Sequence, residues 1–359
     1  MNLESILNKY PDSLNGISDL LANKEPSFMF NCLIHAFGYL LKNEPGKVLS
    51  KNGVLLRRNL NILIRTLGRG FLKCPQVIEN RNVLRNPDST EKDPGITLPD
   101  TPVIWAPNHY FKDDTLASIT ALKRHAYILF GSLPQFYNTF DGVTAWLNGV
   151  VMTNRKSSAS KKASLPKAIR VMDYGADLLV FGEGVWNKTP NRLLLDFWPG
   201  IYRIAKETGC LVVPMAHYIE DPTNKKANNV IHTVVDDPIR IDNLSEKAGL
   251  DYLRDIIATW HYLMMERYGK STREEELQRH KTITSAWEQA LIDRVSTTDM
   301  YDTEIEFIAD YRPKELILPE TVFQAIADIP NISKSNAQHI AFANNLVNLR
   351  KTEDFQRRF

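Results

Sequence analysis

The sequence predicts an α/β fold: a mostly parallel sheet flanked by helices, with an N-terminal helical pair and a C-terminal helical region. The first observation behind this prediction is that short apolar runs alternate with amphipathic stretches between residues 101 and 242. The alternation recurs over roughly 20 to 30 residues, which is typical of strand–helix–strand units in a parallel sheet. The second is the composition, because 43% apolar and 24% charged residues are the balance of a folded chain and exclude a disordered one.

The individual elements follow from the apolar patterning. Apolar runs of strand length occur at 102–106, 126–130, 149–153, 177–181, 210–216 and 229–235. Helical patterns lie between them at 113–125, within 133–147, at 164–175 and at 198–209. Two more helical patterns, at 27–42 and 53–72, precede the strands, and a long one begins at residue 244.

The chain divides into three regions. Its 359 residues are enough for about two domains and for a sizeable core. A connector rich in Pro, Asp and Gly, at 86–100, separates an N-terminal helical region, 1–100, from an α/β domain at 101–242. Residues 243–359 are rich in charge and helical in pattern, and we expect them to form the C-terminal helical region.

Charge and cysteine content narrow the function classes. Lys and Arg total 44 against 42 Asp and Glu, and a net charge of +2 argues against a nucleic-acid partner. The three cysteines are too scattered for a disulfide framework, and no metal site is predicted. The N-terminus lacks a secretory signal pattern, and the apolar run 27–41 is too short to span a bilayer. We therefore expect a cytoplasmic protein.

The segment 51–73 is amphipathic and basic. One face of its helical wheel is apolar and the other carries Lys and Arg, with no acidic residue in between. The apolar residues are Leu56, Leu60, Leu63, Ile64, Leu67 and Phe71, and the basic ones are Lys51, Arg58, Arg65, Arg69 and Lys73. Together with the short apolar run before it, this predicts docking on an anionic membrane surface through residues 27–73. The alternative is that both helices pack their apolar faces on the α/β core and leave the basic residues in solvent.

A histidine and an aspartate follow the first predicted strand of the α/β domain. In PVIWAPNHYFKDDTL, His109 comes directly after the apolar run, and Asp114 stands where the next helix begins. Active sites of open α/β sheets lie at the carboxyl ends of the strands. A carboxylate bonded to one imidazole nitrogen leaves the other nitrogen free to take a proton from a hydroxyl. The alternatives are a histidine with a purely structural role and an Asp that caps the helix.

Other strand ends carry further candidates. Arg155 follows the strand at 149–153 and opens a basic stretch, 155–170, that suits a phosphate or an acidic protein, or is simply a solvated loop. Gly182 and Gly184 flank Glu183 after the strand at 177–181 and allow a ligand to approach the backbone, unless they form a plain turn. Pro214 lies near the end of the next strand.

These residues, in this order, resemble the four motif blocks of the glycerophospholipid acyltransferases, the 1-acylglycerol-3-phosphate acyltransferase superfamily. The blocks are Asn108-His109 with Asp114, Gly149 to Arg155, Phe181-Gly182-Glu183-Gly184, and Val212-Val213-Pro214. The resemblance covers the α/β domain alone, although an N-terminal helical pair that docks on the membrane is also found in the family.

The resemblance implies an acyl transfer in which His109 is the base and Asp114 orients it. Arg155 would bind the phosphate of the acceptor, and Glu183 with Gly184 would shape the acceptor site. Asn108 would bind substrate, and Pro214 would belong to the acyl-donor side or to the wall of the cleft. The co-substrate would be acyl-CoA or an acylated acyl-carrier protein, without any metal or bound cofactor.

One position departs from the family pattern. The third block usually continues with Thr-Arg-Ser, but Trp186 stands here in place of that arginine. An indole makes no bidentate phosphate contact. The resemblance makes lysophosphatidic acid the first expectation for a lysophospholipid-like acceptor, whereas Trp186 favours the alternative, a non-phosphorylated lipid or alcohol. A non-catalytic lipid-binding scaffold is a third possibility, since the C-terminal region has no assigned chemistry.

Overall fold

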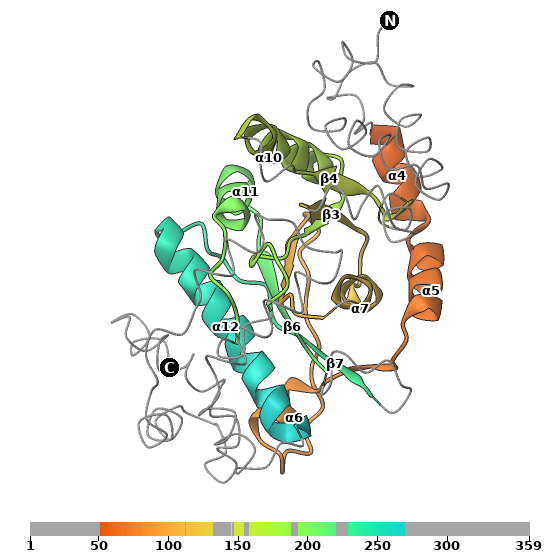
Figure 1. Cartoon of the computed structure of the whole chain (residues 1–359), viewed down its shortest axis with the longest axis vertical. Coiled ribbons are helices and arrows are strands. Elements are labelled where there is room, and N and C mark those ends of the chain that lie inside the picture. The colour runs from red at the N-terminus through yellow and green to blue at the C-terminus, as the bar shows by residue number, and fades with distance from the viewer. Residues whose placement is uncertain are drawn as a thin grey trace, which may run out of the picture.

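The computed structural model describes residues 51–111, 113–131, 145, 147–153, 158–187, 193–219 and 229–269. These residues form a seven-stranded sheet in the order β1-β7-β6-β2-β5-β3-β4, with helices on both faces (Figure 1). The strands are β1 (Gln76–Ile78), β2 (Ile104–Pro107), β3 (Ala126–Phe130), β4 (Val150–Met152), β5 (Asp177–Leu179), β6 (Val212–Tyr218) and β7 (Ile231–Val235). The helices are α4 (Lys51–Asn59), α5 (Asn61–Phe71), α6 (Arg81–Arg85), α7 (Asp114–Ala121), α10 (Ser158–Asp173), α11 (Gly200–Thr208) and α12 (Glu246–Tyr268).

All neighbouring strands of this sheet are parallel except β6 and β7, which are antiparallel. The carboxyl ends of β2, β3, β4, β5 and β6 therefore lie along one edge of the sheet. In register, Ala106 of β2 pairs with Pro214 of β6, and Ile104 pairs with Leu178 of β5. This arrangement confirms the predicted α/β class with a mostly parallel sheet flanked by helices.

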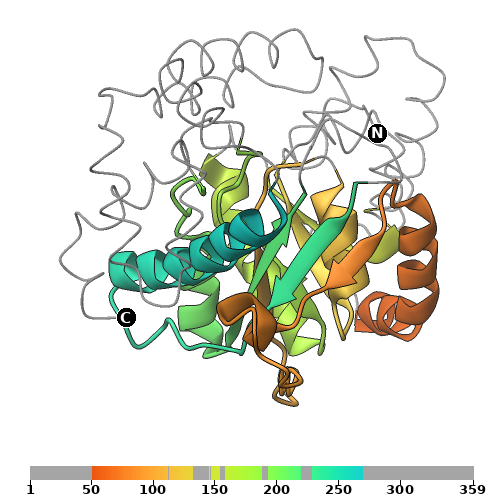
Figure 2. The ribbon, with the colours of Figure 1, turned by 90° about the horizontal axis from the view of Figure 1, so that it is seen from below.

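Two hydrophobic cores lie on opposite faces of the sheet. Successive residues of β2 alternate between them, because side chains of a strand point to opposite faces in turn. Ile104 and Ala106 pack in the core that contains α10, α11 and α12, whereas Trp105 packs in the core that contains α7. Figure 1 shows α10, α11 and α12 on one side of the sheet and α5 and α7 on the other, and Figure 2 shows α12 lying across the sheet in the orthogonal view.

Several elements differ from those predicted. The single helical pattern at 53–72 is two helices, α4 and α5, which meet at Leu60. The short elements β1 and α6 carry too little pattern to have been predicted. The predicted helix at 27–42, most of the stretch 133–147 and residues 270–359 lie outside the described residues. Within the part that is described, no helix is both long and apolar enough to cross a membrane.

The helices α4 and α5 turn their apolar face outward. The exposed fractions of six large apolar residues lie between 43% and 79%, namely Leu56, Leu60, Ile62, Leu63, Leu67 and Phe71. Two arginines of the same helices contact the rest of the protein: the partly buried Arg65 donates to the carbonyl of Thr120 at 3.3 Å, and the exposed Arg58 donates to that of Gly175 at 3.3 Å. The six exposed residues therefore do not pack on the core, contrary to the alternative raised from the sequence. These helices meet the core through other residues, the fully buried Val54 and the partly buried Ile64.

Candidate active site

The turn between β2 and α7 holds His109 against Asp114. The His109 Nδ1 atom lies 2.8 Å from Asp114 Oδ2, with the Asp114 side chain fully buried and the imidazole 16% exposed. Because a carboxylate only accepts, Nδ1 carries the proton and donates it. The lone pair is thereby placed on Nε2, which is the tautomer that a general base requires.

The Asp114 carboxylate is itself fixed by backbone donors. The N–H groups of Tyr110 and Phe111 donate to Oδ2 at 3.0 and 3.4 Å. Asp114 is also the first residue of α7, where the helix dipole favours a negative charge. These contacts fix the position of the fully buried Asp114 side chain.

Glu183 lies beyond the end of β5 and connects two loops. Its Oε1 accepts the backbone N–H of His109 at 2.8 Å, and its Oε2 accepts the backbone N–H of Leu195 at 2.8 Å. Burial raises the pKa of the Glu183 carboxyl to about 8, while the backbone N–H groups of Leu195 and His109 act in the opposite direction. In this position Glu183 holds the loop that carries His109.

The two glycines beside Glu183 are required by close packing. A Cβ atom on Gly182 would lie 2.6 Å from the Phe197 ring, and Gly184 has a φ of 72° with Trp198 against it. Any larger residue would push the ring of Phe197 away or strain the backbone. Gly184 is therefore needed for the left-handed backbone conformation of this turn.

We expect the Glu183→Gln substitution to remove a pH dependence of stability. The folded chain holds the carboxyl proton up to about pH 8, whereas the ordinary value is 4.5. Between these values the folded state binds the extra proton, so the free energy of unfolding falls as the pH rises, by at most about 1.4 kcal/mol per pH unit. Urea unfolding at several pH values from 5 to 8 measures this slope. The exposed Glu207 on α11 provides the control, since Glu207→Gln should keep the wild-type slope; equal slopes in wild type and Glu183→Gln would contradict the prediction.

Aromatic rings surround the imidazole of His109. The Phe181 ring centroid lies 4.3 Å from that of His109, and the Trp186 ring lies 5.9 Å away in an edge arrangement. The backbone N–H of Asn187 donates to the carbonyl of His109 at 2.6 Å, which keeps this segment beside the imidazole. The imidazole therefore lies against apolar surface, where charge interactions are stronger than in water.

Asn108 connects the carboxyl end of β2 to that of β6. Its Oδ1 accepts the N–H of His217 at 2.7 Å, and its Nδ2 donates to the carbonyl of the same residue at 3.0 Å. Nδ2 also lies 2.7 Å from Nδ1 of His261 on α12. The Asn108 side chain is almost completely buried, so in this structure it fixes the turn before His109.

A buried histidine beside the site was missed from the sequence. His217 of β6 lies 2.8 Å from the Ser118 hydroxyl and 2.9 Å from the Thr233 hydroxyl. Burial lowers its pKa to about 4, so the ring is neutral at physiological pH. Ser118 in turn donates to the carbonyl of Asp114 at 2.8 Å. The signal in the sequence that could have identified His217 is its position as a polar residue within an otherwise apolar strand.

The remaining predicted residues are placed differently. Pro214 lies inside the buried strand β6, next to Ala106. Arg155 lies outside the described residues, three positions after β4. Across the ranges that the structure describes, no group of three or more His, Cys, Asp or Glu side chains could hold a metal ion. His109, Asp114, Glu183 and Asn108 are therefore brought together at one edge of the sheet, and Pro214 lies in the strand beside them.

Comparisons with known proteins show what this part of the chain is similar to. A solved structure, that of the 1-acyl-sn-glycerophosphate (LPA) acyltransferase PlsC from Thermotoga maritima, matches with a TM-score of 0.45 and 16% identity, over 68% of this chain and 95% of that chain. No curated protein sequence matches. Residues 78–218 match the family model described as Acyltransferase, which spans His109, Asp114 and Glu183. Residues 78–218 are therefore similar to the acyltransferase family.

Proposed function

We propose that the protein is a peripheral membrane acyltransferase of glycerolipid metabolism. It moves a fatty acyl group from acyl-CoA or acyl-carrier protein to a hydroxyl of a lysophospholipid-like acceptor, with lysophosphatidic acid as the first candidate. The observation that carries this proposal is the His109–Asp114 pair, with its Nδ1–Oδ2 distance of 2.8 Å and a partly exposed imidazole. The family match supports the acyl-transfer class.

In the proposed mechanism His109 is the general base. Its Nε2 takes the proton of the acceptor hydroxyl while the oxygen attacks the carbonyl carbon of the thioester. A C–O bond forms, the C–S bond breaks, and the imidazolium returns the proton to the departing thiolate. Between these two proton transfers the Asp114 carboxylate stabilises the imidazolium, as a buried carboxylate does in hydrolytic triads.

The outward apolar face of α4 and α5 supports membrane binding. Its exposed residues include Ile62 at 79%, and the exposed Lys51, Arg69 and Lys73 lie on the same two helices or directly after them. Two contributions stabilise the binding of a helix at a membrane surface: apolar side chains enter the lipid, and cations attract anionic headgroups. We infer that a membrane with anionic lipid occupies this face.

Trp186 motivates the second candidate, a lipid or alcohol acceptor without phosphate. Its ring lies 5.9 Å from that of His109, so it borders the place where the acceptor hydroxyl must come. We expect Trp186→Arg to raise kcat/KM for lysophosphatidic acid relative to a non-phosphorylated acceptor by about tenfold, since an arginine–phosphate contact is charge-assisted.

An acceptor screen with one labelled acyl thioester tests both candidates. Lysophosphatidic acid and monoacylglycerol are compared in wild type and Trp186→Arg, with Trp186→Phe as the control that keeps an aromatic ring. The phosphorylated acceptor is favoured if wild type acylates lysophosphatidic acid and Arg155→Ala loses this activity. Turnover of monoacylglycerol alone favours the other, and an unchanged preference in Trp186→Arg contradicts the role of Trp186. Vesicle binding without transfer from either donor would indicate the non-catalytic scaffold.

A further inference from the structure

Helix α12 carries two polar side chains that contact the segments around the candidate active site. The helix lies across the sheet (Figure 2) and follows the residues that match the family model, 78–218. Arg254 and His261 are seven residues apart, which is about two helical turns, so they share one face of α12. The exposed fraction is 13% for the Arg254 side chain and 4% for His261. This face of α12 is therefore turned toward the protein interior.

His261 contacts the residues on both sides of His109 in the chain. Its Nδ1 lies 2.7 Å from Nδ2 of Asn108. Its ring meets that of Tyr110 edge-on, at a centroid distance of 5.0 Å. The residue before the proposed base and the residue after it are thus both in contact with one buried imidazole of α12.

The contact through Nδ1 of His261 exists in either neutral tautomer. With the proton on Nδ1, the ring donates to the carbonyl of His217 at 2.8 Å. With the proton on Nε2, Nδ1 accepts an N–H of Asn108, whose other N–H donates to the same carbonyl. In both cases His261 holds the Asn108–His217 pair, and thereby the turn that leads into His109.

Arg254 reaches the same turn from its other side, through the loop that precedes α11. Its Nη1 pairs with Oδ1 of Asp196, which directly follows Leu195. The N–H of Leu195 donates to Glu183, and Glu183 also accepts the N–H of His109, both at 2.8 Å. Arg254 is therefore connected to the backbone of His109 through one ion pair and two hydrogen bonds.

We propose that Arg254 and His261 are positioning residues, through which α12 holds the imidazole of His109 at the carboxyl edge of the sheet. The inference rests on the proposed acyl transfer, in which Nε2 of His109 must meet the acceptor hydroxyl. A displacement of a reacting group by about 1 Å can lower a rate about 100-fold. The unit that places the base therefore extends beyond residues 78–218 and includes Glu246–Tyr268.

Two variants of His261 separate positioning from packing. In His261→Asn the amide is attached to Cγ, as Nδ1 is in histidine, so it can still bond to His217 or Asn108. His261→Leu instead fills most of the space and removes the hydrogen bond. We expect kcat of His261→Asn to stay within about threefold of wild type and that of His261→Leu to fall about tenfold or more, with KM unchanged. A lower kcat in His261→Asn than in His261→Leu would show that the ring only packs.

The Arg254 contact is tested at its two carboxylate partners. Asp196→Asn removes the partner in the loop, whereas Asp251→Asn removes the partner on α12 itself, which lies 3.3 Å from Nη2. We expect kcat to fall about threefold to fivefold in Arg254→Gln and in Asp196→Asn, and no further in the double variant, because both changes break one contact. Asp251→Asn should keep the wild-type kcat. Additive losses in the double variant, or equal losses in the two Asp variants, would overturn the role of Arg254.

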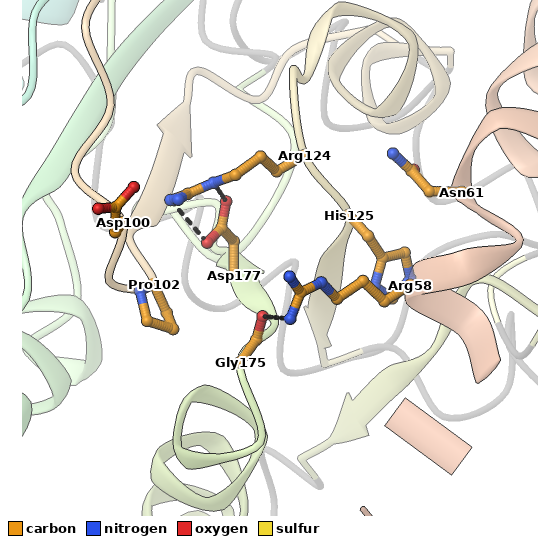
Figure 3. A pocket seen from close by; sticks show the side chains of 8 residues that line it. All are labelled: Arg58, Asn61, Asp100, Pro102, Arg124, His125, Gly175 and Asp177. Carbon is orange, nitrogen blue, oxygen red and sulfur yellow. Dashed lines mark hydrogen bonds and ion pairs between the residues drawn. The ribbon is translucent and has the colours of Figure 1, made fainter. Parts of the chain in front are cut away.

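A destabilised variant at the opposite edge of the sheet is the control for loss of stability. Arg124 donates to the buried Asp177 at 3.1 and 3.0 Å, at the amino ends of the parallel strands β3 and β5, as Figure 3 shows. Arg124→Gln removes the cation from this carboxylate and should lower the midpoint of thermal unfolding. Well below that temperature its kcat should equal that of wild type. A loss of kcat as large as in His261→Leu would mean that instability explains both.

Hydrogen–deuterium exchange of the full chain examines the turn without any substrate. The N–H of His109 donates to Glu183 at 2.8 Å, and that of Tyr110 donates to Asp114 at 3.0 Å. Exchange at these two N–H groups therefore measures how firmly the turn is held.

We expect both N–H groups to exchange faster in His261→Leu and Arg254→Gln, and at the wild-type rate in Asp251→Asn. Exchange that stays at the wild-type rate in His261→Leu and Arg254→Gln would overturn the proposal. If wild type transfers no acyl group, the proposed function fails, but faster exchange in these variants would still show that α12 holds the turn.

Discussion

The His109→Ala enzyme is expected to transfer acyl groups about 10³-fold to 10⁴-fold more slowly than wild type. In the proposed mechanism the imidazole removes the proton of the acceptor hydroxyl, and general-base assistance contributes factors of this size. Asp114→Asn should show a loss close to this range, because an amide that donates to Nδ1 selects the wrong tautomer. Both variants should lower kcat with little change in KM, measured with a labelled acyl thioester at saturating acceptor.

A matched control exists elsewhere in the structure. His232 Nδ1 lies 2.7 Å from Glu79 Oε1, and both side chains are about as buried as those of the catalytic candidates. Tyr268 covers this second imidazole–carboxylate pair, since its ring stacks on His232 and its hydroxyl donates to Glu79. His232→Ala should therefore keep the rate of transfer. A rate in His109→Ala within about tenfold of wild type would refute the general-base role.

The Ile62→Glu/Leu67→Glu double variant is expected to lose membrane binding by about 100-fold or more. Both residues are more than half exposed, and burial of each such side chain in lipid contributes about 1.5–3 kcal/mol. Added negative charge also opposes anionic headgroups. Co-sedimentation with anionic vesicles measures the loss, while transfer to a water-soluble acceptor should stay near the wild-type rate.

The control for this variant adds the same charges without removing apolar surface. Asn59→Glu/Thr66→Glu places two carboxylates at exposed positions of the same two helices. Its loss of binding should be about tenfold or less, because only the electrostatic contribution changes. Equal losses in the two variants would show that charge alone governs binding, and no loss in the apolar variant would remove α4 and α5 from the membrane contact.

The sequence predicted the central sheet and the His109–Asp114 pair because both are local. The strand at Ala126–Phe130 has the predicted bounds, and the others lie within a few residues of theirs. His109 and Asp114 share one turn, so the end of a strand and the start of a helix were enough to place them together. Short apolar runs between amphipathic segments carry this information without any long-range contact.

The orientation of helices α4 and α5 and the partners of the site residues depend on tertiary contacts, which the periodicity of the sequence does not predict. The periodicity predicts that Leu63 and Leu67 share one face of a helix. It does not tell which face meets the core, because that depends on partners such as the carbonyls of Thr120 and Gly175, which accept hydrogen bonds from arginines of these helices. The resemblance implies that Glu183 shapes the acceptor site, whereas in the structure its partners are the backbone N–H groups of His109 and Leu195, which come together only once the loops are folded. The three residues of β1 are too few for a strand pattern.

Only four residues separate His109 from Asp114, and both belong to a connection between two packed elements. In the proposed reaction, the base and the carboxylate that orients it would therefore shift together whenever this connection moves. The loop after β5 contacts the same connection through Glu183 and Asn187. Exchanges in that loop would therefore alter the choice of acceptor and the removal of its proton together.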